Sequence, residues 1–408
     1  MTLAEELQKA VPSVLTREWG QLNRGAPWQG GTPELLVSPA STEEVAQVLT
    51  WAGQEKVGVL PLGSGRHLAP VGPGSFIALD TSLLSSVDEY EPADLTITAG
   101  TGTSFDTVDA ALRGNGQWAP FDPPGVGESS IGGFVSEASH SFLWTGYGAL
   151  RNHVLGATLV TGDGRVLRLG GKVVKNVAGY DLLRPVVGGR GRLGVLTSVC
   201  LRAFPLPAHE RVLVLKDSGI TSLIELALLV GTAPVLPASI VVVGQADMLG
   251  GSSALVLRVH GAESSVDADQ STIEKHLGMS FDVVACAEAD GLLNEIQDRG
   301  GLDSRCVEVS VLPSRLPQVV AAAEQVGVAR AAIDSYAGRL RMGSNDMSAD
   351  AVTALRLAVE QLGGSLRVAR WDGALRPEDT SRRDAELDLT KRLESIFDPS
   401  GVLWPTRP

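Results

Sequence analysis

Apolar and polar positions in the first part of the chain follow a strand, helix, strand order that occurs twice. Residues 35–37 form the first apolar run, and Ser41-Thr-Glu-Glu44 is a capping box that begins a helix with apolar residues along one face. A strand at residues 57–62 follows. The second unit has a strand at residues 95–99 and a helix that Ser104 caps. This order predicts two crossover units in a first domain.

A hairpin is expected in the later part of the first domain. Residues 154–160 and 165–169 are strand-like and flank Thr161-Gly-Asp-Gly164, which is typical of a hairpin turn. The segment at residues 203–207 contains two prolines and marks the expected end of this domain.

A different pattern begins at Arg211, where strands and helices alternate. We predict strands at residues 212–215, 239–243, 254–259, 307–311, 331–336 and 365–369, and helices at 222–230, 267–277, 317–326 and 349–362. Two split α/β units of this kind build one antiparallel sheet with helices on one face. The apolar stretch 223–243 has the length of a membrane span but contains Glu225 and two prolines, so it predicts a helix, a turn and a buried strand.

Length and charge limit the classes of function. The 408 residues exceed the usual size of one hydrophobic core, so we expect two domains. The net charge of -13 comes without a long basic block, which argues against nucleic acid binding. The first nine residues include Glu5 and Glu6 and show no secretory signal. We expect a cytoplasmic protein without a transmembrane span; peripheral association with the inner membrane through partners stays open.

Several catalytic and metal-binding patterns are missing from the sequence. No GxSxG elbow and no HExxH motif is present, which disfavours hydrolysis. The six histidines lack metal-ligand spacing, and the three cysteines, Cys200, Cys286 and Cys306, form no CxxC pair. We therefore predict no metal site and no iron–sulfur cluster in this chain, whereas redox chemistry on a bound cofactor stays open.

Two glycine-rich loops in separate parts of the sequence could contact a dinucleotide. Gly63-Ser-Gly-Arg-His67 follows a strand and can form a backbone nest for a pyrophosphate. Gly127-Glu-Ser-Ser-Ile-Gly-Gly133 precedes a helix start. Each loop alone also fits a simpler structure, a β-turn for the first and a capped helix start for the second. Their coincidence favours a dinucleotide held between two lobes.

A third segment combines glycines with polar side chains. It runs from Gly171 through Lys172-Val-Val-Lys-Asn-Val-Ala-Gly-Tyr-Asp-Leu182 and is followed by Gly191-Arg-Leu-Gly-Val-Leu-Thr197. Glycine lets the backbone approach a planar ring closely. The segment can therefore wrap a large planar ligand, although two hairpin turns would also explain its glycines.

These motifs resemble the FAD-linked oxidase family of vanillyl-alcohol oxidase and p-cresol methylhydroxylase, and most closely the FAD-binding subunits of bacterial glycolate oxidases. The similarity covers about residues 33–207 and the C-terminal Phe397-Asp-Pro-Ser-Gly-Val402. The resemblance implies an α+β fold, with a two-lobed FAD-binding domain of the p-cresol methylhydroxylase type and a cap domain that has an antiparallel sheet. The implied domains are an N-terminal helical segment (1–32), the FAD-binding domain (33–207), the cap for substrate or partner (208–395) and a returning C-terminal segment (396–408).

The resemblance also implies the residues that bind FAD. Those expected at the pyrophosphate are Gly63, Ser64, Gly65, Arg66 and His67, with Pro61 just before them also expected to bind the cofactor. Those expected along the diphosphate and isoalloxazine are Gly127, Ser129, Ser130, Gly132 and Gly133. Backbone approach to the adenine or ring system is expected from Gly191, Gly194 and Val195. Side chains expected near the flavin, or alternatively pinning their own segment by hydrogen bonds, are Lys175, Asn176, Tyr180 and Asp181. Covalent members have a histidine where this chain has Arg66, so FAD is expected to bind non-covalently.

The implied function is glycolate oxidation to glyoxylate within a complex, and the catalytic residues remain unknown. The expected partners are a second FAD-linked subunit with a metal-dependent 2-hydroxyacid site and an iron–sulfur subunit that receives electrons. The cap of this chain lacks the histidine cluster of the family's hydroxyacid dehydrogenases and offers four arginines as possible anion ligands, Arg339, Arg341, Arg367 and Arg370. A non-catalytic assembly subunit and a stand-alone alcohol or hydroxy-acid oxidase are the alternatives.

Overall fold

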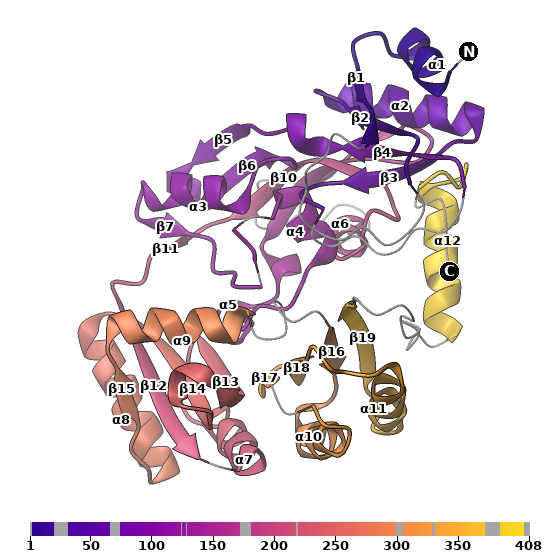
Figure 1. Cartoon of the computed structure of the whole chain (residues 1–408). Coiled ribbons are helices and arrows are strands. Elements are labelled where there is room, and N and C mark those ends of the chain that lie inside the picture. Colours follow the sequence, from indigo (N-terminus) through magenta and orange to yellow (C-terminus); the bar gives the residue numbers. More distant parts are fainter. Residues whose placement is uncertain are drawn as a thin grey trace.

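The computed structural model describes residues 2–19, 32–65, 74–123, 125–127, 129–171, 181–217, 219–298, 305–328, 331–371 and 384–403. Figure 1 shows two sheets from the N-terminal half on one side and a large sheet from the C-terminal half on the other. The α+β fold class predicted from the sequence is confirmed.

The first sheet has four strands in the order β1-β2-β4-β3. Their bounds are β1 Leu15–Arg17, β2 Leu35–Ser38, β3 Gly58–Leu62 and β4 Phe76–Asp80. The β2, β4 and β3 strands are parallel, as crossover connections require. The helices α1 (Leu3–Ala10) and α2 (Thr42–Glu55) pack on the core of this sheet. Ser41 caps α2 by accepting from Glu44 N, whereas the Glu44 carboxylate accepts from Ala40 N and does not close the predicted box.

The second sheet is antiparallel and has five strands in the order β5-β6-β10-β8-β9. Their bounds are β5 Val87–Glu91, β6 Thr96–Gly100, β8 Val154–Val160, β9 Val166–Gly170 and β10 Val195–Arg202. Its core includes residues from α3 (Phe105–Arg113), α4 (Ile131–Glu137) and α6 (Leu183–Val186). A small pair, β7 (Gln117–Trp118) with β11 (Phe204–Pro205), and the short helix α5 (Trp144–Tyr147) lead toward the third sheet.

The third sheet has eight antiparallel strands in the order β15-β12-β14-β13-β17-β18-β16-β19. Their bounds are β12 His209–Asp217, β13 Ser239–Ala246, β14 Ser252–Gly261, β15 Asp282–Val284, β16 Cys306–Ser310, β17 Ala331–Asp334, β18 Arg339–Gly343 and β19 Ser365–Arg370. The sheet consists of two similar four-stranded units, β12 to β15 and β16 to β19. The second strand of each unit, β13 or β17, lies in the middle of the sheet, and these two strands pair with each other. This is the repeated unit that the sequence pattern predicts.

Four helices cover one face of the large sheet, as predicted. They are α7 (Ile220–Val230), α8 (Glu263–Leu277), α10 (Leu316–Gln325) and α11 (Ala349–Gln361). A fifth helix, α9 (Cys286–Asp298), was not predicted and packs on the opposite face through Leu292 and Ile296. Phe142 from the N-terminal half belongs to the same cluster. The opposite face is therefore the one turned toward the first two sheets (Figure 1).

The C-terminal segment returns to the N-terminal half after α12 (Asp384–Phe397). Phe397 packs in the core of the second sheet, and Leu403 forms a parallel bridge with Val59 of β3. The buried Asp398 carboxylate accepts from Val402 N at 3.0 Å and from Leu403 N at 2.9 Å. This carboxylate fixes the turn that brings the chain end onto the first sheet.

Replacing Asp398 with alanine is expected to lower the free energy of unfolding by about 2–3 kcal/mol, because two backbone N–H groups lose a charged acceptor in a buried place. Urea unfolding at neutral pH measures the loss. The matched control is Asp388→Ala, since Asp388 is exposed and pairs with Arg392 one turn along α12. Equal stabilities for the two variants would show that Asp398 does not fix the C-terminal turn.

Candidate functional site

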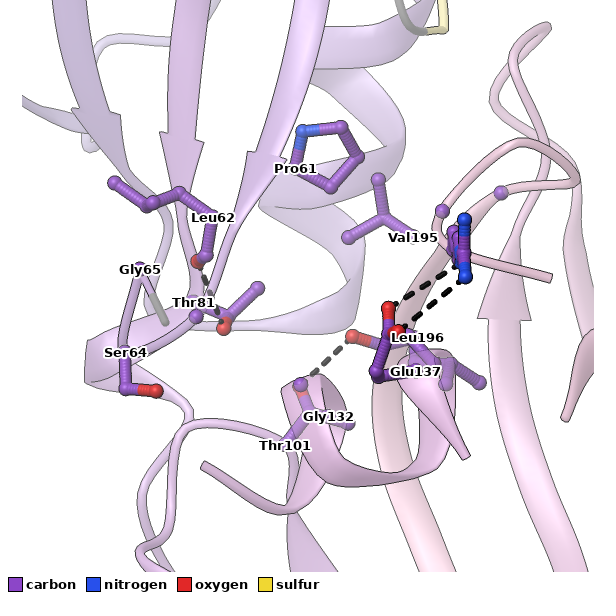
Figure 2. Close-up of a pocket in the computed structure, with 16 residues that line it drawn as sticks. Pro61, Leu62, Ser64, Gly65, Thr81, Thr101, Gly132, Glu137, Val195 and Leu196 are labelled. Carbon is purple, nitrogen blue, oxygen red and sulfur yellow. Dashed lines mark hydrogen bonds and ion pairs between the residues drawn. The ribbon is translucent and has the colours of Figure 1, made fainter. Parts of the chain in front are cut away.

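A cavity lies where the ends of strands from the first two sheets meet α4. Sixteen described residues line it, and Figure 2 shows how their side chains surround the hollow. Some of them lie at the end of β3 and directly after β4 and β6. The others lie on one side of α4, at the start of β10 and in the loop before β10. The space between these atoms, counting the open mouth, is about 660 Å³.

The structure brings together nine residues that the sequence predicted as cofactor ligands. These lining residues are Pro61, Gly63, Ser64, Gly65, Gly132, Gly133, Gly191, Gly194 and Val195. They come from three segments far apart in the sequence. Five further predicted residues, Arg66, His67, Lys175, Asn176 and Tyr180, lie outside the described residues.

Four other predicted residues are described but do not line this cavity. Ser130 caps α4 by accepting from Gly133 N at 3.2 Å, and its hydroxyl would collide with a Cβ on Gly63. Ser129 donates to Gly125 O, and Gly127 packs against Asp106. Asp181 accepts from Leu183 N and Arg184 Nε. The contacts of these four residues shape the loops around the cavity.

Seven lining residues were missed by the sequence-based prediction: Leu62, Thr81, Thr101, Ser136, Glu137, Arg190 and Leu196. Some are neighbours of predicted motifs: Leu62 precedes Gly63, and Arg190 precedes Gly191. Glu137 lies one helical turn beyond Gly133, on the same side of α4. A search one turn along the helix would have found it, whereas Thr81 and Thr101 carry no motif.

Hydroxyl groups join the strand ends that form the wall. Thr81 donates from Oγ1 to Leu62 O at 3.2 Å, and Thr101 donates from Oγ1 to Leu196 O at 2.8 Å (Figure 2). The N–H of Gly132 donates to Thr101 O at 2.8 Å. These bonds tie β3 to β4, and β6 to both β10 and α4. The cavity wall is therefore a connected backbone framework.

Two glycines in the wall have backbone conformations that other residues rarely adopt. Gly191 has φ +72°, and a Cβ built on it would lie 3.3 Å from Pro61 Cγ. Gly194 has φ +149°, and its Cβ would lie 2.5 Å from Val160 O. Without a Cβ at these positions, the backbone can turn sharply and come close to a ligand.

A carboxylate in the wall lies between two guanidinium groups. The Glu137 side chain is 6% exposed, and its Oε2 atom lies 3.3 Å from Arg190 Nε; Figure 2 draws this pair. Arg190 Nη2 donates to Oε1 at 3.4 Å. The second guanidinium belongs to Arg367 of β19, which donates to the same Oε1 atom. The large sheet thus contacts a residue that lines the cavity.

The charged contacts continue along the large sheet. Arg367 also donates to Glu308 Oε2, and Arg341 Nε lies 3.7 Å from Glu308 Oε1. Burial raises the pKa of Glu308, but Arg367 and Arg341 outweigh it and lower the pKa to about 2. The Arg341 side chain is 4% exposed and donates to the carbonyls of Gln297 and His140, both at 3.1 Å.

The four predicted arginines therefore differ in their surroundings. Arg341 and Arg367 are engaged in the contacts above, and Arg370 is exposed. Arg339 of β18 is also exposed, and no hydrogen bond or ion pair joins its side chain to another residue in the described part of the chain. Arg339 lies in the electrostatic field of Glu308, Arg367, Asp334 and Arg151. Within the described residues, Arg339 and Arg370 are thus the two of the four whose guanidinium groups are not already engaged, and Arg339 is the one on the same face of β18 as Arg341.

The cavity and the fold define a class of protein, one that binds a nucleotide-containing cofactor between two lobes. The lining suits such a ligand: glycines permit close backbone approach, apolar side chains such as Val195 can flank a ring, and Ser64 and Arg190 can contact phosphate or ring oxygens. The described residues contain no group of three His, Cys, Asp or Glu side chains able to hold a metal ion. Over the same residues, no helix has both the length and the apolar character to cross a membrane.

Comparisons with known proteins identify the cofactor as FAD. Residues 33–170 match the family described as the FAD binding domain. The chain is 39% identical to glycolate oxidase subunit GlcE of Escherichia coli (strain K12) over 173 residues, 42% of this chain and 48% of that protein. It is 28% identical to glycolate oxidase subunit GlcD of Bacillus subtilis (strain 168) over 258 residues, 59% of this chain and 54% of that protein. The chain thus spans about half the length of these curated relatives.

A solved structure of alkyldihydroxyacetonephosphate synthase has the same fold. It superposes with a TM-score of 0.76, covering 100% of this chain and 85% of that one, at 17% identity. This superposition shows the two-lobed FAD-binding fold of the p-cresol methylhydroxylase type predicted from the sequence, and the matched FAD binding domain with the two curated relatives supports a link to the FAD-linked oxidases.

Proposed function

We propose that this chain is the FAD-binding subunit of a complex that oxidises glycolate to glyoxylate. The observation that carries the proposal is the meeting of nine predicted residues from three distant segments in one cavity. The 39% identity with a subunit named for glycolate oxidase supports the choice of substrate. In this proposal a second FAD-linked subunit with a metal-dependent site and an iron–sulfur subunit complete the complex.

FAD occupies the cavity in this proposal. The backbone from Gly63 to Gly65 and the Ser64 hydroxyl hold the pyrophosphate, while Val195 and the glycines at 191 and 194 approach the rings. When bound, FAD supplies an acceptor for the two electrons that leave the substrate. The framework bonds of Thr81 and Thr101 keep this site preformed.

Arg339 is the proposed ligand of the substrate carboxylate. The side chain comes from the large sheet, whose neighbouring Arg367 contacts the cavity residue Glu137. A guanidinium can bind a carboxylate through two parallel hydrogen bonds. Arg341 is less suited because its guanidinium already donates to two carbonyls. In this proposal an anionic 2-hydroxy acid lies between the large sheet and the cofactor cavity.

The test of this function is an absorbance spectrum of the purified chain, followed by anaerobic addition of glycolate. We expect a yellow protein that releases FAD on acid precipitation and bleaches with glycolate. A flavin that stays oxidised with glycolate until partner subunits are added would favour an assembly or relay subunit. Rapid reoxidation by oxygen would favour a stand-alone oxidase. A chain that binds no FAD after incubation with it would refute the proposed site.

Replacing Arg339 with glutamine is expected to raise the KM for glycolate about 10- to 100-fold, with a smaller change in kcat, since a charge-assisted contact to the substrate is lost. Steady-state kinetics with a dye acceptor, in the complex if partners are needed, measures both constants. Arg370→Gln is the matched control because it removes an exposed arginine from β19 of the same sheet, at the other end of the intervening strand β16. Unchanged kinetics in Arg339→Gln would exclude this arginine as the carboxylate ligand.

A further inference from the structure

A line of alternating charges joins the cavity wall to the large sheet. It runs from Arg190 to Glu137, then through Arg367 to Glu308 and ends at Arg341. Glu137 and Arg341 are nearly enclosed, with side chains 6% and 4% exposed. Glu137 and Arg367 are 230 residues apart in sequence. Their contact therefore depends on how the large sheet sits against the FAD-binding half.

Arg367 has two carboxylate partners, Glu308 on the neighbouring strand and Glu137 on α4. Glu308 lies opposite Arg367 in the β16–β19 pairing and accepts from its Nη2 atom. The Nη1 atom is thereby left to reach across to Glu137. Glu137 is also partnered by Arg190, so its single negative charge faces two positive ones. With Glu308 and Arg341 included, the whole line has three positive and two negative side chains, so its net charge is +1.

We propose that Arg367 is a positioning residue that tunes the reduction potential of the flavin through Glu137. The inference rests on the proposed placement of FAD in this cavity. Two-electron reduction adds negative charge to the flavin ring system, so a net positive wall favours the reduced form. Arg367 supplies part of that positive field and keeps the Glu137 carboxylate turned toward the cations.

Charge alone fixes the direction of the effect. Arg367→Gln leaves Glu137 with one cation and removes one positive charge from the wall, which disfavours flavin reduction. Glu137→Gln leaves two cations without their carboxylate, which favours it. For a unit charge about 10 Å from the ring in a medium of effective dielectric about 20, the reduction equilibrium changes about tenfold. A tenfold change is about 30 mV for a two-electron couple.

The experiment measures the flavin midpoint potential of the full-length FAD-loaded chain, by anaerobic equilibration with a reference dye. We expect Arg367→Gln to lower the potential by about 30 mV and Glu137→Gln to raise it by about as much. The double variant should return close to the wild-type value, because the two charge changes cancel. Arg370→Gln, an exposed arginine of the same strand, is the control and should not shift the potential.

A purely structural role for the contact predicts a different pattern. Both single variants would then lower the melting temperature while the potential stays at the wild-type value, or both would shift it in the same direction. Either result would overturn the proposal. The potential is measured without glycolate, so a chain that cannot oxidise glycolate still gives the same readout. Failure of the tuning mechanism is thereby separated from failure of the proposed substrate.

Discussion

Replacing Gly191 with valine is expected to weaken FAD binding at least 100-fold. The Cβ alone would approach Pro61 Cγ to 3.3 Å, and the two methyl groups of valine would add bulk in the cavity that the rings need. The backbone at φ +72° also disfavours a β-branched residue, at a cost of about 1–3 kcal/mol. Both the bulk of the valine side chain and the backbone strain are expected to weaken the binding of a cofactor that needs the backbone close to its rings. Titration of the apoprotein with FAD, followed by flavin fluorescence, measures the dissociation constant.

Gly116 provides the matched control for the backbone cost. It has φ +66°, close to that of Gly191, but a Cβ there would meet no atom within 4 Å. Gly116→Val should therefore lose a similar amount of stability and keep wild-type FAD affinity. Thermal melts of both apoproteins check that the stability losses are comparable. If Gly191→Val bound FAD as tightly as the control, the cofactor would not occupy this cavity.

The sequence reveals glycine positions of the site better than its other positions, for a physical reason. Gly63, Gly191 and Gly194 are visible because glycine marks turns and permits close backbone approach, so a cluster of glycines can be recognised from the sequence. Thr81 and Thr101 are ordinary strand-end residues, and their place in the wall follows only from the pairing of distant strands. The contact of Glu137 with Arg367 depends on packing between the two halves of the chain, which no local pattern records.

The large sheet was predictable as a repeat, because each split unit has its own strand and helix periodicity. Three elements escaped prediction, the strands β15 and β18 and the helix α9, and β15 is only three residues long. The β18 strand is only five residues long and carries two arginines among its apolar residues. The α9 helix contains Gly291, which weakens a helical pattern, and it packs by few apolar residues on the face turned toward the first half. Short strands and helices with a weak apolar pattern, such as β18 and α9, form because of tertiary contacts that the local sequence does not reveal.

Removing the Glu308 carboxylate is expected to produce a stability loss that depends on pH. The pKa of this group is about 2 in the folded protein, below the value of 4.5 for a free side chain. A carboxylate with a depressed pKa stabilises the fold above pH 4.5, and this contribution disappears as the pH falls toward 2. A difference of this size corresponds to about 3 kcal/mol at neutral pH, somewhat less after allowance for the partial exposure of the side chain. Glu308→Gln should lose about that amount at pH 6, because two arginines then lack their shared partner.

The difference in unfolding free energy between wild type and Glu308→Gln should decrease by about 2 kcal/mol between pH 6 and pH 3. The reason is that the Glu308 carboxylate of the unfolded wild-type chain binds a proton in this range, which removes the stabilisation that the ionised carboxylate gives to the folded protein. Urea unfolding at several pH values in this interval gives the difference directly. Glu360→Gln is the control, because Glu360 is exposed on α11 and its replacement should leave both stability and its pH dependence near wild type. If this difference in unfolding free energy stays constant from pH 6 to pH 3, Arg341 and Arg367 do not hold the Glu308 carboxylate ionised. The charged contact between the large sheet and the cavity would then contribute little to the stability of the fold.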